Sequence, residues 1–410
     1  MTTNTTSYPK QRIKVLLLEN IHQSAQELIL ADGLSLEVNS AALGEKELCE
    51  KIADVHLLGI RSKTQVTEEV LKAGRRLLSV GCFCIGTNQV DLVAANHRGV
   101  AVFNAPFSNT RSVAELIIAE VIALSRKLLD RSSGMHQGKW NKSASGSFEV
   151  RGKTLGIIGY GHIGRQVGVM AEFMGMNVLF YDIVQRLPMG NNRPVNSLHE
   201  LLAACDFVTL HVPATERTKN MIGPEELAQM RPGSYLLNLS RGSVVVIPAL
   251  AEAIKSKHLG GAAIDVFPSE PKSNSEKFES PLVGLPNVIL TPHVGGSTEE
   301  AQEAIGKEVA NALLRFLNTG STALAVNFPQ LDPPELLGRH RILNIHKNVP
   351  GVLSRINTII SDLHANVESQ ILATDANVGY LVMDLDRDVS EEVRRQVSAL
   401  DTDIRTRILY

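Results

Sequence analysis

The feature that most constrains this chain is a glycine-spaced turn between an apolar run and an apolar-periodic stretch. The run is residues 155–158, and the turn reads Gly159-Tyr160-Gly161-His162-Ile163-Gly164. In a strand-turn-helix unit the first glycine permits the tight turn, the second lets the backbone approach a pyrophosphate, and the third lets the helix pack on its strand. The pyrophosphate would rest on the helix N-terminus. The motif therefore predicts a dinucleotide site that includes Gly159, Gly161, His162, Ile163 and Gly164.

Asp182 closes the next apolar run, residues 177–181, about 20 residues beyond the glycines, where this fold places an acidic residue. A carboxylate there hydrogen-bonds a ribose 2′-hydroxyl and repels a 2′-phosphate, so we expect NAD as the cofactor in preference to NADP. Arg186 is close enough in sequence to soften that preference, although a solvated loop arginine is the simpler interpretation.

More than a hundred patterned residues precede the glycine turn, and 410 residues exceed what one core usually serves. Apolar runs at 13–18, 55–60, 77–81 and 100–103, with helix-like stretches between the first three, predict a small parallel α/β domain. Further runs at 155–158, 177–182, 207–212, 235–239, 262–266 and 288–290 predict a doubly wound sheet. We expect a helix over 112–127, with Ser112 as N-cap, and a helix over 299–317 to carry the chain into and out of this inserted domain.

The last part of the chain has a different order of elements. Pro333-Pro334 predicts a linker, and the order after it is strand, helix, strand, strand, helix, strand, which is typical of the ferredoxin-like βαββαβ motif. The expected fold class is therefore α/β, a doubly wound parallel-sheet domain inserted in a smaller α/β domain, plus a C-terminal ferredoxin-like βαββαβ domain. The expected parts are a mobile tail at 1–12, a substrate-binding domain at 13–107 and 299–330, an NAD-binding domain at 108–298, a linker at 331–338 and a third domain at 339–410.

Charge and composition limit the partners. The net charge is −2, so no basic excess points to nucleic acid or to an anionic membrane. No apolar stretch approaches the roughly 18 residues of a membrane span, and residues 1–12 lack the apolar core of a signal peptide, so we expect a cytoplasmic protein. The four cysteines lack C-x-x-C spacing, so we expect no metal and no redox site.

Ligands of open α/β sheets bind beyond the carboxyl ends of the strands. Ser240-Arg241, Asp265, Glu270 and His293 all follow or close the later apolar runs. His293 can accept the hydroxyl proton in a hydride transfer, Glu270 can raise the histidine pKa and fix its tautomer, and Arg241 can bind a substrate carboxylate in a planar fork. Each residue alone has an ordinary structural explanation, but together they predict a 2-hydroxy-acid dehydrogenase.

These segments resemble the D-isomer-specific 2-hydroxyacid dehydrogenase family, and residues 81–91 and 103–112 are most similar to members with one C-terminal ACT domain. The resemblance implies that Arg241, Glu270 and His293 are catalytic. It also implies a cofactor site that includes Leu239, Ser240, Arg241, Asp265, His293, Val294, Gly295 and Gly296.

The resemblance further implies NAD-dependent oxidation of 3-phospho-D-glycerate to 3-phosphohydroxypyruvate, the first step of L-serine synthesis. The implied substrate ligands are Arg61, Ser62, Lys63, Asn109, Arg241 and Lys142. The family pattern has arginine where Lys63 stands, so a bidentate contact becomes a point-charge contact. A solvated loop lysine is an equally good interpretation of Lys142.

The third domain is implied to be an ACT domain that binds L-serine where two copies pair edge to edge, through His346, Asn348 and Asn366. A homo-oligomer, with a tetramer as the family's usual state, and feedback inhibition follow from that resemblance. Gly295-Gly296 is a candidate hinge. Near the ACT junction the family has a second Gly-Gly pair, and here Leu337-Gly338 stands in its place, which restricts the backbone conformations available there. The alternative is an ACT domain that only dimerises.

Two other functions remain open. Arg61 and Lys63 would also bind a distal carboxylate, so the substrate can be another 2-oxo acid such as 2-oxoglutarate. A non-catalytic NAD-sensing scaffold is the alternative from another class, because some proteins of the family resemble transcriptional corepressors. The intact Arg241, Glu270 and His293 set argues against the scaffold.

Overall fold

The computed structural model describes residues 9–271, 275–335 and 340–409. The chain divides into two compact units, and the second, Asn109–Ala301, is inserted into the first, Met1–Ser108 with Gln302–Tyr410. Leu337-Gly338 and residues 1–8 of the expected tail lie outside the described residues. The rest of that tail is structured, since Lys10–Arg12 forms a 3-10 helix and Lys10 pairs with Asp32 at 2.9 Å.

The first unit contains a parallel sheet in the order β2-β1-β3-β4-β5. Four of its strands match the predicted apolar runs, whereas β2 and the short helix α4 were not predicted. β2 is a mostly exposed edge strand, so it has no continuous apolar run. The elements are β1 Lys14–Leu17, α1 Gln23–Ala31, β2 Ser35–Val38, α2 Glu45–Lys51, β3 Leu57–Ile60, α3 Glu68–Ala73, β4 Ser79–Cys82, α4 Leu92–His97 and β5 Ala101–Asn104.

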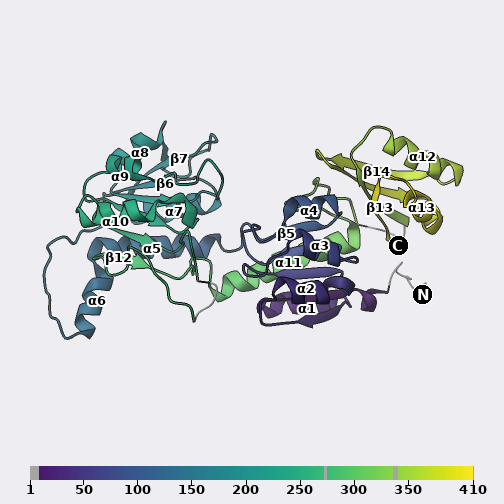
Figure 1. The fold of residues 1–410 in the computed structure, drawn as a ribbon. Coiled ribbons are helices and arrows are strands. Elements are labelled where there is room, and N and C mark those ends of the chain that lie inside the picture. The colour runs from purple at the N-terminus through teal and green to yellow at the C-terminus, as the bar shows by residue number, and fades with distance from the viewer. Residues whose placement is uncertain (1–8, 272–274, 336–339, 410) are drawn as a thin grey trace. The chain divides into compact units, whose positions relative to one another are not determined.

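The second unit contains a parallel sheet in the order β12-β11-β10-β9-β6-β7-β8, as a doubly wound fold requires. Its chain order reverses between β6 and β9, which are neighbours. Helices α5 and α7 cover one face, and α8, α9 and α10 cover the other. Figure 1 shows α5 below this sheet and α8 and α9 above it. The strands are β6 Thr154–Ile158, β7 Asn177–Tyr181, β8 Arg193–Pro194, β9 Phe207–Leu210, β10 Tyr235–Asn238, β11 Gly261–Ile264 and β12 Val288–Leu290. The helices are α5 Thr110–Arg126, α6 Leu128–His136, α7 His162–Phe173, α8 Leu198–Ala204, α9 Pro224–Gln229 and α10 Ile247–Lys255.

The start of α5 corrects one prediction. The helix begins at Thr110 with Asn109 as its N-cap, so Ser112 lies inside the first turn. The Ser112 hydroxyl lies 2.8 Å from the Thr298 hydroxyl and therefore bonds across to another segment rather than capping its own helix. The long helix that leads from this unit back into the first, α11, spans Glu299–Thr319, slightly longer than predicted.

The C-terminal sheet is antiparallel in the order β14-β15-β13-β16 and has the ferredoxin-like arrangement, which confirms the predicted fold class. Helices α12 and α13 pack on one face (Figure 1). The other face joins the core of the first unit, and the Tyr380 hydroxyl donates to the Gly320 carbonyl at 2.7 Å. The elements are β13 His340–Lys347, α12 Val352–Asp362, β14 Val367–Thr374, β15 Val378–Leu385, α13 Ser390–Val397 and β16 Asp403–Leu409.

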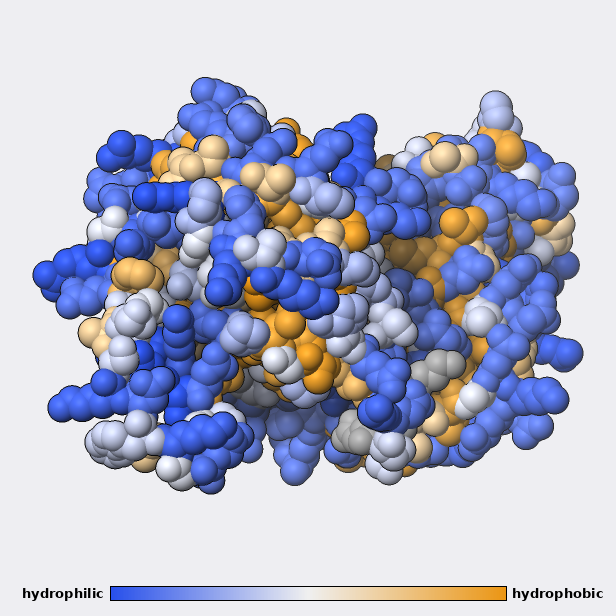
Figure 2. Space-filling model, turned by 60° about the vertical axis from the view of Figure 1, so that its left-hand side comes forward, coloured by the Kyte–Doolittle hydropathy of each residue, from blue (hydrophilic) through white to orange (hydrophobic). Residues whose placement is uncertain are grey.

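The surface is mostly polar. Figure 2 shows a largely hydrophilic face on which hydrophobic residues gather in separate patches. Within the described part of the chain, every helix is too short or too polar to cross a bilayer.

Candidate active site

The glycine turn lies at the carboxyl end of β6, where the strand order reverses. Gly159 has φ +91°, and an added Cβ would lie 2.4 Å from the His211 carbonyl oxygen, so only glycine fits. Gly161 is the N-cap of α7, and its added Cβ would meet no protein atom within 4 Å. Protein packing therefore does not explain this glycine, whereas the close approach of a pyrophosphate does. His162 and Ile163 form the first turn of the helix.

Asp182 is fixed beside this turn at the end of β7. One carboxylate oxygen accepts the Tyr160 N–H at 2.9 Å, and the other accepts the Val184 N–H at 2.9 Å. Arg186 lies 3.4 Å from the same carboxylate, so it pairs with Asp182 instead of being a solvated loop side chain. The hydrogen bond from Tyr160 joins the acidic residue to the glycine turn, as a site for the adenosine end of a dinucleotide requires.

His293 and Glu270 are paired in the second unit. The His293 Nδ1 lies 2.9 Å and 3.1 Å from the two Glu270 oxygens, and Glu270 also accepts the Phe267 N–H at 3.1 Å. The hydrogen bond to Glu270 raises the pKa of His293, and burial and the charge of Arg241 oppose it without cancelling it. Burial alone would raise the pKa of Glu270, but the hydrogen bonds from His293 and Phe267, together with the charges of His293 and Arg241, outweigh burial and lower it. Because Glu270 holds Nδ1, the Nε2 atom is left to exchange a proton with a ligand.

Asp265 organises the loop that carries His293. Its buried carboxylate accepts the Thr291 hydroxyl at 2.6 Å, the Val294 N–H at 2.8 Å and the Gly295 N–H at 2.9 Å. His293 itself has φ +55°, a left-handed conformation that costs a non-glycine residue about 1–2 kcal/mol. Such backbone strain persists where the surroundings determine the conformation and is concentrated at functional sites.

Arg241 is placed by the residue that ends β10. Asn238 donates to the Arg241 carbonyl at 3.0 Å and accepts the Ser240 N–H at 3.1 Å and its hydroxyl at 2.9 Å. A Cβ on the adjacent Gly242 would lie 2.0 Å from the Phe267 carbonyl carbon, so this loop packs directly against the backbone that precedes Glu270. Arg241 and Glu270 thus belong to neighbouring loops at one edge of the sheet.

The same edge gathers most of the predicted residues of this unit. An added Cβ on Gly296 would lie 2.2 Å from the side-chain amide nitrogen of Asn109, and one on Gly295 would lie 3.6 Å from the Leu239 side chain. Gly296 therefore lies against Asn109, and Gly295 lies against Leu239. Lys142 is different: it is exposed in the irregular segment after α6, and among the described residues no hydrogen bond ties it to this cluster. The cluster contains Asn109, Leu239, Ser240, Arg241, Asp265, Glu270, His293, Val294, Gly295 and Gly296.

Arg61, Ser62 and Lys63 lie in the first unit, in the loop that follows β3 at the carboxyl end of the sheet. Arg61 is half-buried, and Ser62 and Lys63 are exposed. The loop therefore presents two cations and a hydroxyl, the chemistry expected for an anion.

The three predicted effector residues are not brought together within one chain. His346 is buried, its Nδ1 lies 2.8 Å from the Asn344 side-chain oxygen, and burial lowers its pKa. Asn348 is exposed and donates to the Asp375 carbonyl at 2.7 Å. His346 pairs in register with Gly379, whereas Val367, next to Asn366, pairs with Leu385. Asn366 therefore lies at the opposite end of the sheet from His346 and Asn348.

Sequence reasoning missed the residues that position this chemistry. Asn238 and Thr291 are invisible as functional residues in the sequence, because each acts only by positioning other residues. Asn238 holds the backbone of the residues that follow it, and Thr291 donates to Asp265. The same is true of Tyr160, whose backbone N–H holds Asp182. Only their position in the sequence could have identified these three residues, since each lies at or shortly after the carboxyl end of a strand.

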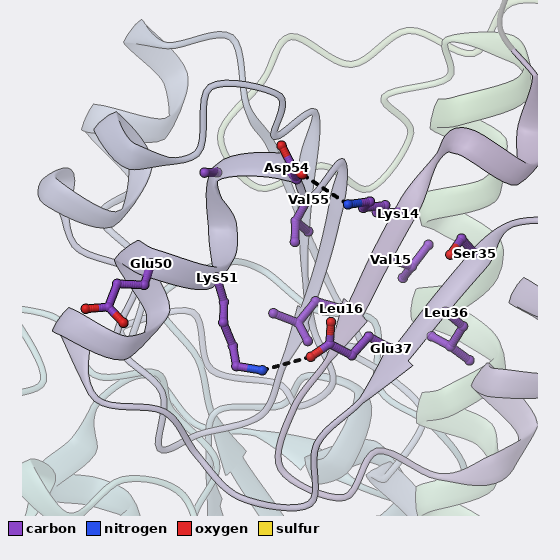
Figure 3. Close-up of a pocket in the computed structure, with 11 residues that line it drawn as sticks. Lys14, Val15, Leu16, Ser35, Leu36, Glu37, Glu50, Lys51, Asp54 and Val55 are labelled. Carbon is purple, nitrogen blue, oxygen red and sulfur yellow. Dashed lines mark hydrogen bonds and ion pairs between the residues drawn. The ribbon is translucent and has the colours of Figure 1, made fainter.

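A cavity of about 430 Å³ lies away from these residues, lined by β1, β2 and the segment from the end of α2 to Val55 in the first unit. Lys14 points toward Asp54 at 3.0 Å and Lys51 toward Glu37 at 2.9 Å, as Figure 3 shows. Each lysine that lines the cavity is thus neutralised by a carboxylate, and none of the predicted site residues lines it.

Comparison with known proteins identifies the family of the chain. Residues 118–295 match the NAD-binding domain of the D-isomer specific 2-hydroxyacid dehydrogenases, and residues 342–405 match the AHAS small subunit-like ACT domain. A D-3-phosphoglycerate dehydrogenase of Dictyostelium discoideum is 55% identical over 406 residues, covering 99% of both chains. That of Escherichia coli K12 is 53% identical over 407 residues, covering 98% of this chain and 99% of the other.

Solved structures show the same fold. The TT0316 protein of Thermus thermophilus is 30% identical with a TM-score of 0.68, covering 74% of this chain and 97% of its own. The D-lactate dehydrogenase of Aquifex aeolicus, solved with NAD and lactic acid, is 29% identical with a TM-score of 0.65, covering 74% of this chain and 95% of its own. The chain therefore belongs to the D-3-phosphoglycerate dehydrogenases that carry a C-terminal ACT domain, within the NAD-binding D-isomer-specific 2-hydroxyacid dehydrogenase family.

Proposed function

We propose that the protein oxidises 3-phospho-D-glycerate to 3-phosphohydroxypyruvate with NAD, the first step of L-serine synthesis, and that L-serine inhibits it. The observation that carries this proposal is the His293–Glu270 pair at 2.9 Å, in a chain that matches a D-3-phosphoglycerate dehydrogenase over 99% of its length. The nearby Arg241 supplies the fork for the substrate carboxylate.

The proposed chemistry assigns one task to each residue. NAD supplies the hydride acceptor when it is bound. Arg241 pairs with the carboxylate on C1 of the substrate and orients C2, and the neutral Nε2 of His293 accepts the proton of the C2 hydroxyl. Glu270 then stabilises the imidazolium through Nδ1, which keeps the proton on His293 until it is released. In the reverse direction the protonated His293 donates to the carbonyl oxygen of the 2-oxo acid.

Asp182 supports a preference for NAD over NADP. Its carboxylate is held by two backbone N–H groups and would face a 2′-phosphate with a negative charge. The Arg186 contact partly offsets that charge. A higher kcat/KM with NADPH than with NADH would contradict the preference.

We assign the substrate phosphate to Arg61, Ser62 and Lys63, with Asn109 and Lys142 as further substrate contacts. A second candidate substrate is 2-oxoglutarate, because the same loop offers point charges that bind a distal carboxylate as well as a phosphate. Comparing kcat/KM for 3-phosphohydroxypyruvate and 2-oxoglutarate separates the two. A scaffold without catalysis would show no turnover with either.

The serine site is proposed to form between two copies of the chain. Because Asn366 lies at the opposite end of the sheet from His346 and Asn348, a two-fold pairing of the β14 edges places Asn366 of one copy toward His346 and Asn348 of the other. Exposed hydrophobic side chains support a second contact between copies, which would give a tetramer. They lie in and after α6 and are Leu128, Leu129, Met135, Trp140 and Phe148.

The first experiment follows NADH oxidation by the purified chain with 3-phosphohydroxypyruvate, with and without millimolar L-serine. Turnover that serine suppresses supports both the activity and the effector site. Turnover indifferent to serine leaves the activity and reduces the ACT domain to an assembly module. No turnover contradicts the proposed activity and directs the assay to 2-oxoglutarate.

A further inference from the structure

A carboxylate lies directly beneath the loop that carries Arg61, Ser62 and Lys63. Glu19 follows β1, the strand next to β3 in the first sheet, and it is only 8% exposed. The loop follows β3, so Glu19 and the loop lie at the carboxyl ends of neighbouring parallel strands. Glu19 itself has φ +62° and the next residue, Asn20, has φ +55°. A left-handed glutamate is uncommon and indicates that contacts around it fix the backbone.

Those contacts are hydrogen bonds from the loop backbone. The Glu19 carboxylate accepts the Arg61 N–H at 3.2 Å, the Lys63 N–H at 3.0 Å and the Thr64 N–H at 2.8 Å. Three N–H donors compensate the buried negative charge and turn these peptide groups toward Glu19. Within the described chain the Ser62 N–H has no such partner, and Ser62 is exposed.

Gln89 holds the same loop from its other side. It is 3% exposed, and its side-chain amide donates to the Arg61 carbonyl at 2.7 Å and the Gly86 carbonyl at 3.2 Å. The Val66 N–H donates to the Gln89 carbonyl at 2.8 Å, so the end of the loop is tied to the segment after β4 as well. Residues 81–91 have no part in the proposed catalytic chemistry. These contacts give the segment a structural role, which is to hold the loop that follows β3.

We propose that Glu19 and Gln89 are positioning residues that shape the 61–64 loop into a receptor for the distal anion of the substrate. Glu19 takes the N–H groups of Arg61, Lys63 and Thr64, so the loop turns the Ser62 N–H and the side chains of Arg61, Ser62 and Lys63 toward the substrate. The inference rests on the proposed function, because it takes that loop as the phosphate site.

The charge of Glu19 makes this arrangement informative. A carboxylate near a phosphate site opposes anion binding by Coulomb repulsion. We expect a carboxylate there only if its hydrogen bonds to the loop increase the affinity for the anion by more than the repulsion lowers it. Replacing Glu19 with glutamine removes the charge but also replaces an acceptor with an N–H₂ group that cannot accept from the loop. If electrostatics governed the loop, Glu19→Gln would strengthen anion binding; if positioning governs it, the same change weakens anion binding.

The test compares Glu19→Gln with the wild-type full chain in steady-state kinetics. We expect the KM for 3-phosphohydroxypyruvate to rise about tenfold or more, since charge-assisted hydrogen bonds to the loop are lost. The kcat, the KM for NADH and the kcat/KM for pyruvate, which has no distal anion, should stay within about twofold. Gln89→Met should change the same KM in the same direction by a smaller factor.

Binding of inorganic phosphate, measured by calorimetry, tests the loop without turnover. The Kd for phosphate should rise in Glu19→Gln in parallel with the KM, and this result supports the inference even if the proposed substrate is wrong. Glu172→Gln is the matched control. Glu172, in α7 of the second unit, also accepts a backbone N–H from a loop, that of Asn191 at 3.1 Å. This variant should leave the Kd for phosphate unchanged.

Three results would overturn the inference. They are an unchanged or lower Kd for phosphate in Glu19→Gln, an equal loss of kcat/KM with pyruvate and with 3-phosphohydroxypyruvate, and a wild-type chain that binds no phosphate. If Glu19→Gln unfolds at the assay temperature, Gln89→Met decides the question by the same measurements, because it removes the other clamp and leaves the carboxylate in place.

Discussion

The catalytic cluster and the proposed serine site differ in how strand direction distributes their residues. In the parallel sheet of the second unit, residues that follow β10, β11 and β12 all meet at one edge, so Arg241, Glu270 and His293 lie together in a single chain. In the antiparallel sheet, β13 and β14 both run antiparallel to β15 and hence parallel to each other. His346 and Asn348 are at or beyond the end of β13, whereas Asn366 precedes β14, so they lie at opposite ends. The catalytic cluster thus lies within one copy, whereas the proposed serine site would require two.

The largest expected effect concerns the cluster that lies within one copy. His293→Ala should lower kcat by about 10²–10⁴-fold, because it removes the group that accepts the hydroxyl proton. The Kd for NADH should change by a far smaller factor, because the other predicted cofactor residues are intact, and the oligomeric state should be unchanged. Stopped-flow binding of NADH and steady-state turnover measure the two quantities on one preparation. A loss of less than about tenfold would remove His293 from the chemistry.

The buried charges of the two regions also differ. Glu120 on α5 is 3% exposed, and neither of its carboxylate oxygens has a partner among the described residues. In the ACT domain the equally buried Arg341 and Asp384 are paired at 2.6 Å and 2.8 Å. Burial, and secondarily the charge of Asp265, raises the pKa of Glu120 to about 8. The catalytic unit thus contains an unpaired acid next to the residue that organises the His293 loop.

Glu120→Gln should make the free energy of unfolding less dependent on pH. The folded chain holds a proton on Glu120 up to about pH 8, whereas the unfolded chain releases it near its ordinary value, so this group destabilises the fold increasingly as pH rises between those values. The variant lacks this loss, and its stability relative to wild type should grow by a few kcal/mol across the window and stay constant above it. Urea unfolding at several pH values measures the difference.

The prediction concerns how the difference in unfolding free energy between Glu120→Gln and wild type changes with pH, and not the size of that difference at any single pH. A buried glutamine amide also lacks partners, and that cost is the same at every pH. An Asp384→Asn variant offers a contrast, because it leaves Arg341 unpaired and should lower stability at every pH instead. A stability difference for Glu120→Gln that is flat from pH 5 to 8 would show that Glu120 is ionised in the folded chain.

The fold was largely predictable because buried parallel strands are continuous apolar runs. The runs that correspond to β1, β3, β4 and β5 are almost entirely buried and were all found, whereas the exposed edge strand β2 and the two-residue β8 carry no such signal. Short polar helices were missed for the same reason, and α6 has no buried residue.

The predicted catalytic residues were placed by one rule, that ligands bind after the carboxyl ends of strands. Applied to β1, the same rule would also have named Glu19, which was missed because its partners are backbone N–H groups of a distant loop. The separation of Asn366 from His346 was implicit in the predicted βαββαβ motif, because β13 and β14 run parallel on either side of β15, but the pairing of individual residues was not predictable. The roles of the site residues stay predictions.

The two-copy serine site can be tested by mixing variants. Asn348→Ala and Asn366→Ala should each raise the serine concentration for half-inhibition by about tenfold or more, with kcat unchanged, because each removes a hydrogen-bonding group from both junctions of a pair. A mixed pair of the two variants should recover part of the sensitivity. One of its junctions combines the intact Asn348 of one copy with the intact Asn366 of the other.

Co-expression of two differently tagged chains yields the mixed species for a serine titration. Mixtures of each variant with itself are the control and should stay insensitive. If the mixed species is as insensitive as either parent, the two asparagines belong to separate sites or to one site within a single chain, and the contrast between the two regions fails.

The smallest effect concerns the pH dependence of the catalytic pair. The hydrogen bond to Glu270 raises the pKa of His293, so Glu270→Gln should lower that pKa toward the ordinary value. In the oxidation direction His293 must be neutral to accept a proton, and activity is lost as pH falls through its pKa. The acidic limb of kcat/KM should therefore move to lower pH in the variant. In the reduction direction His293 must be protonated, so the alkaline limb should move to lower pH as well.

The plateau of kcat/KM should fall in both directions, because the glutamine no longer stabilises the imidazolium. A lower plateau with both limbs unmoved would mean that Glu270 orients the His293 ring without setting its pKa, and unchanged profiles would separate Glu270 from the catalytic site.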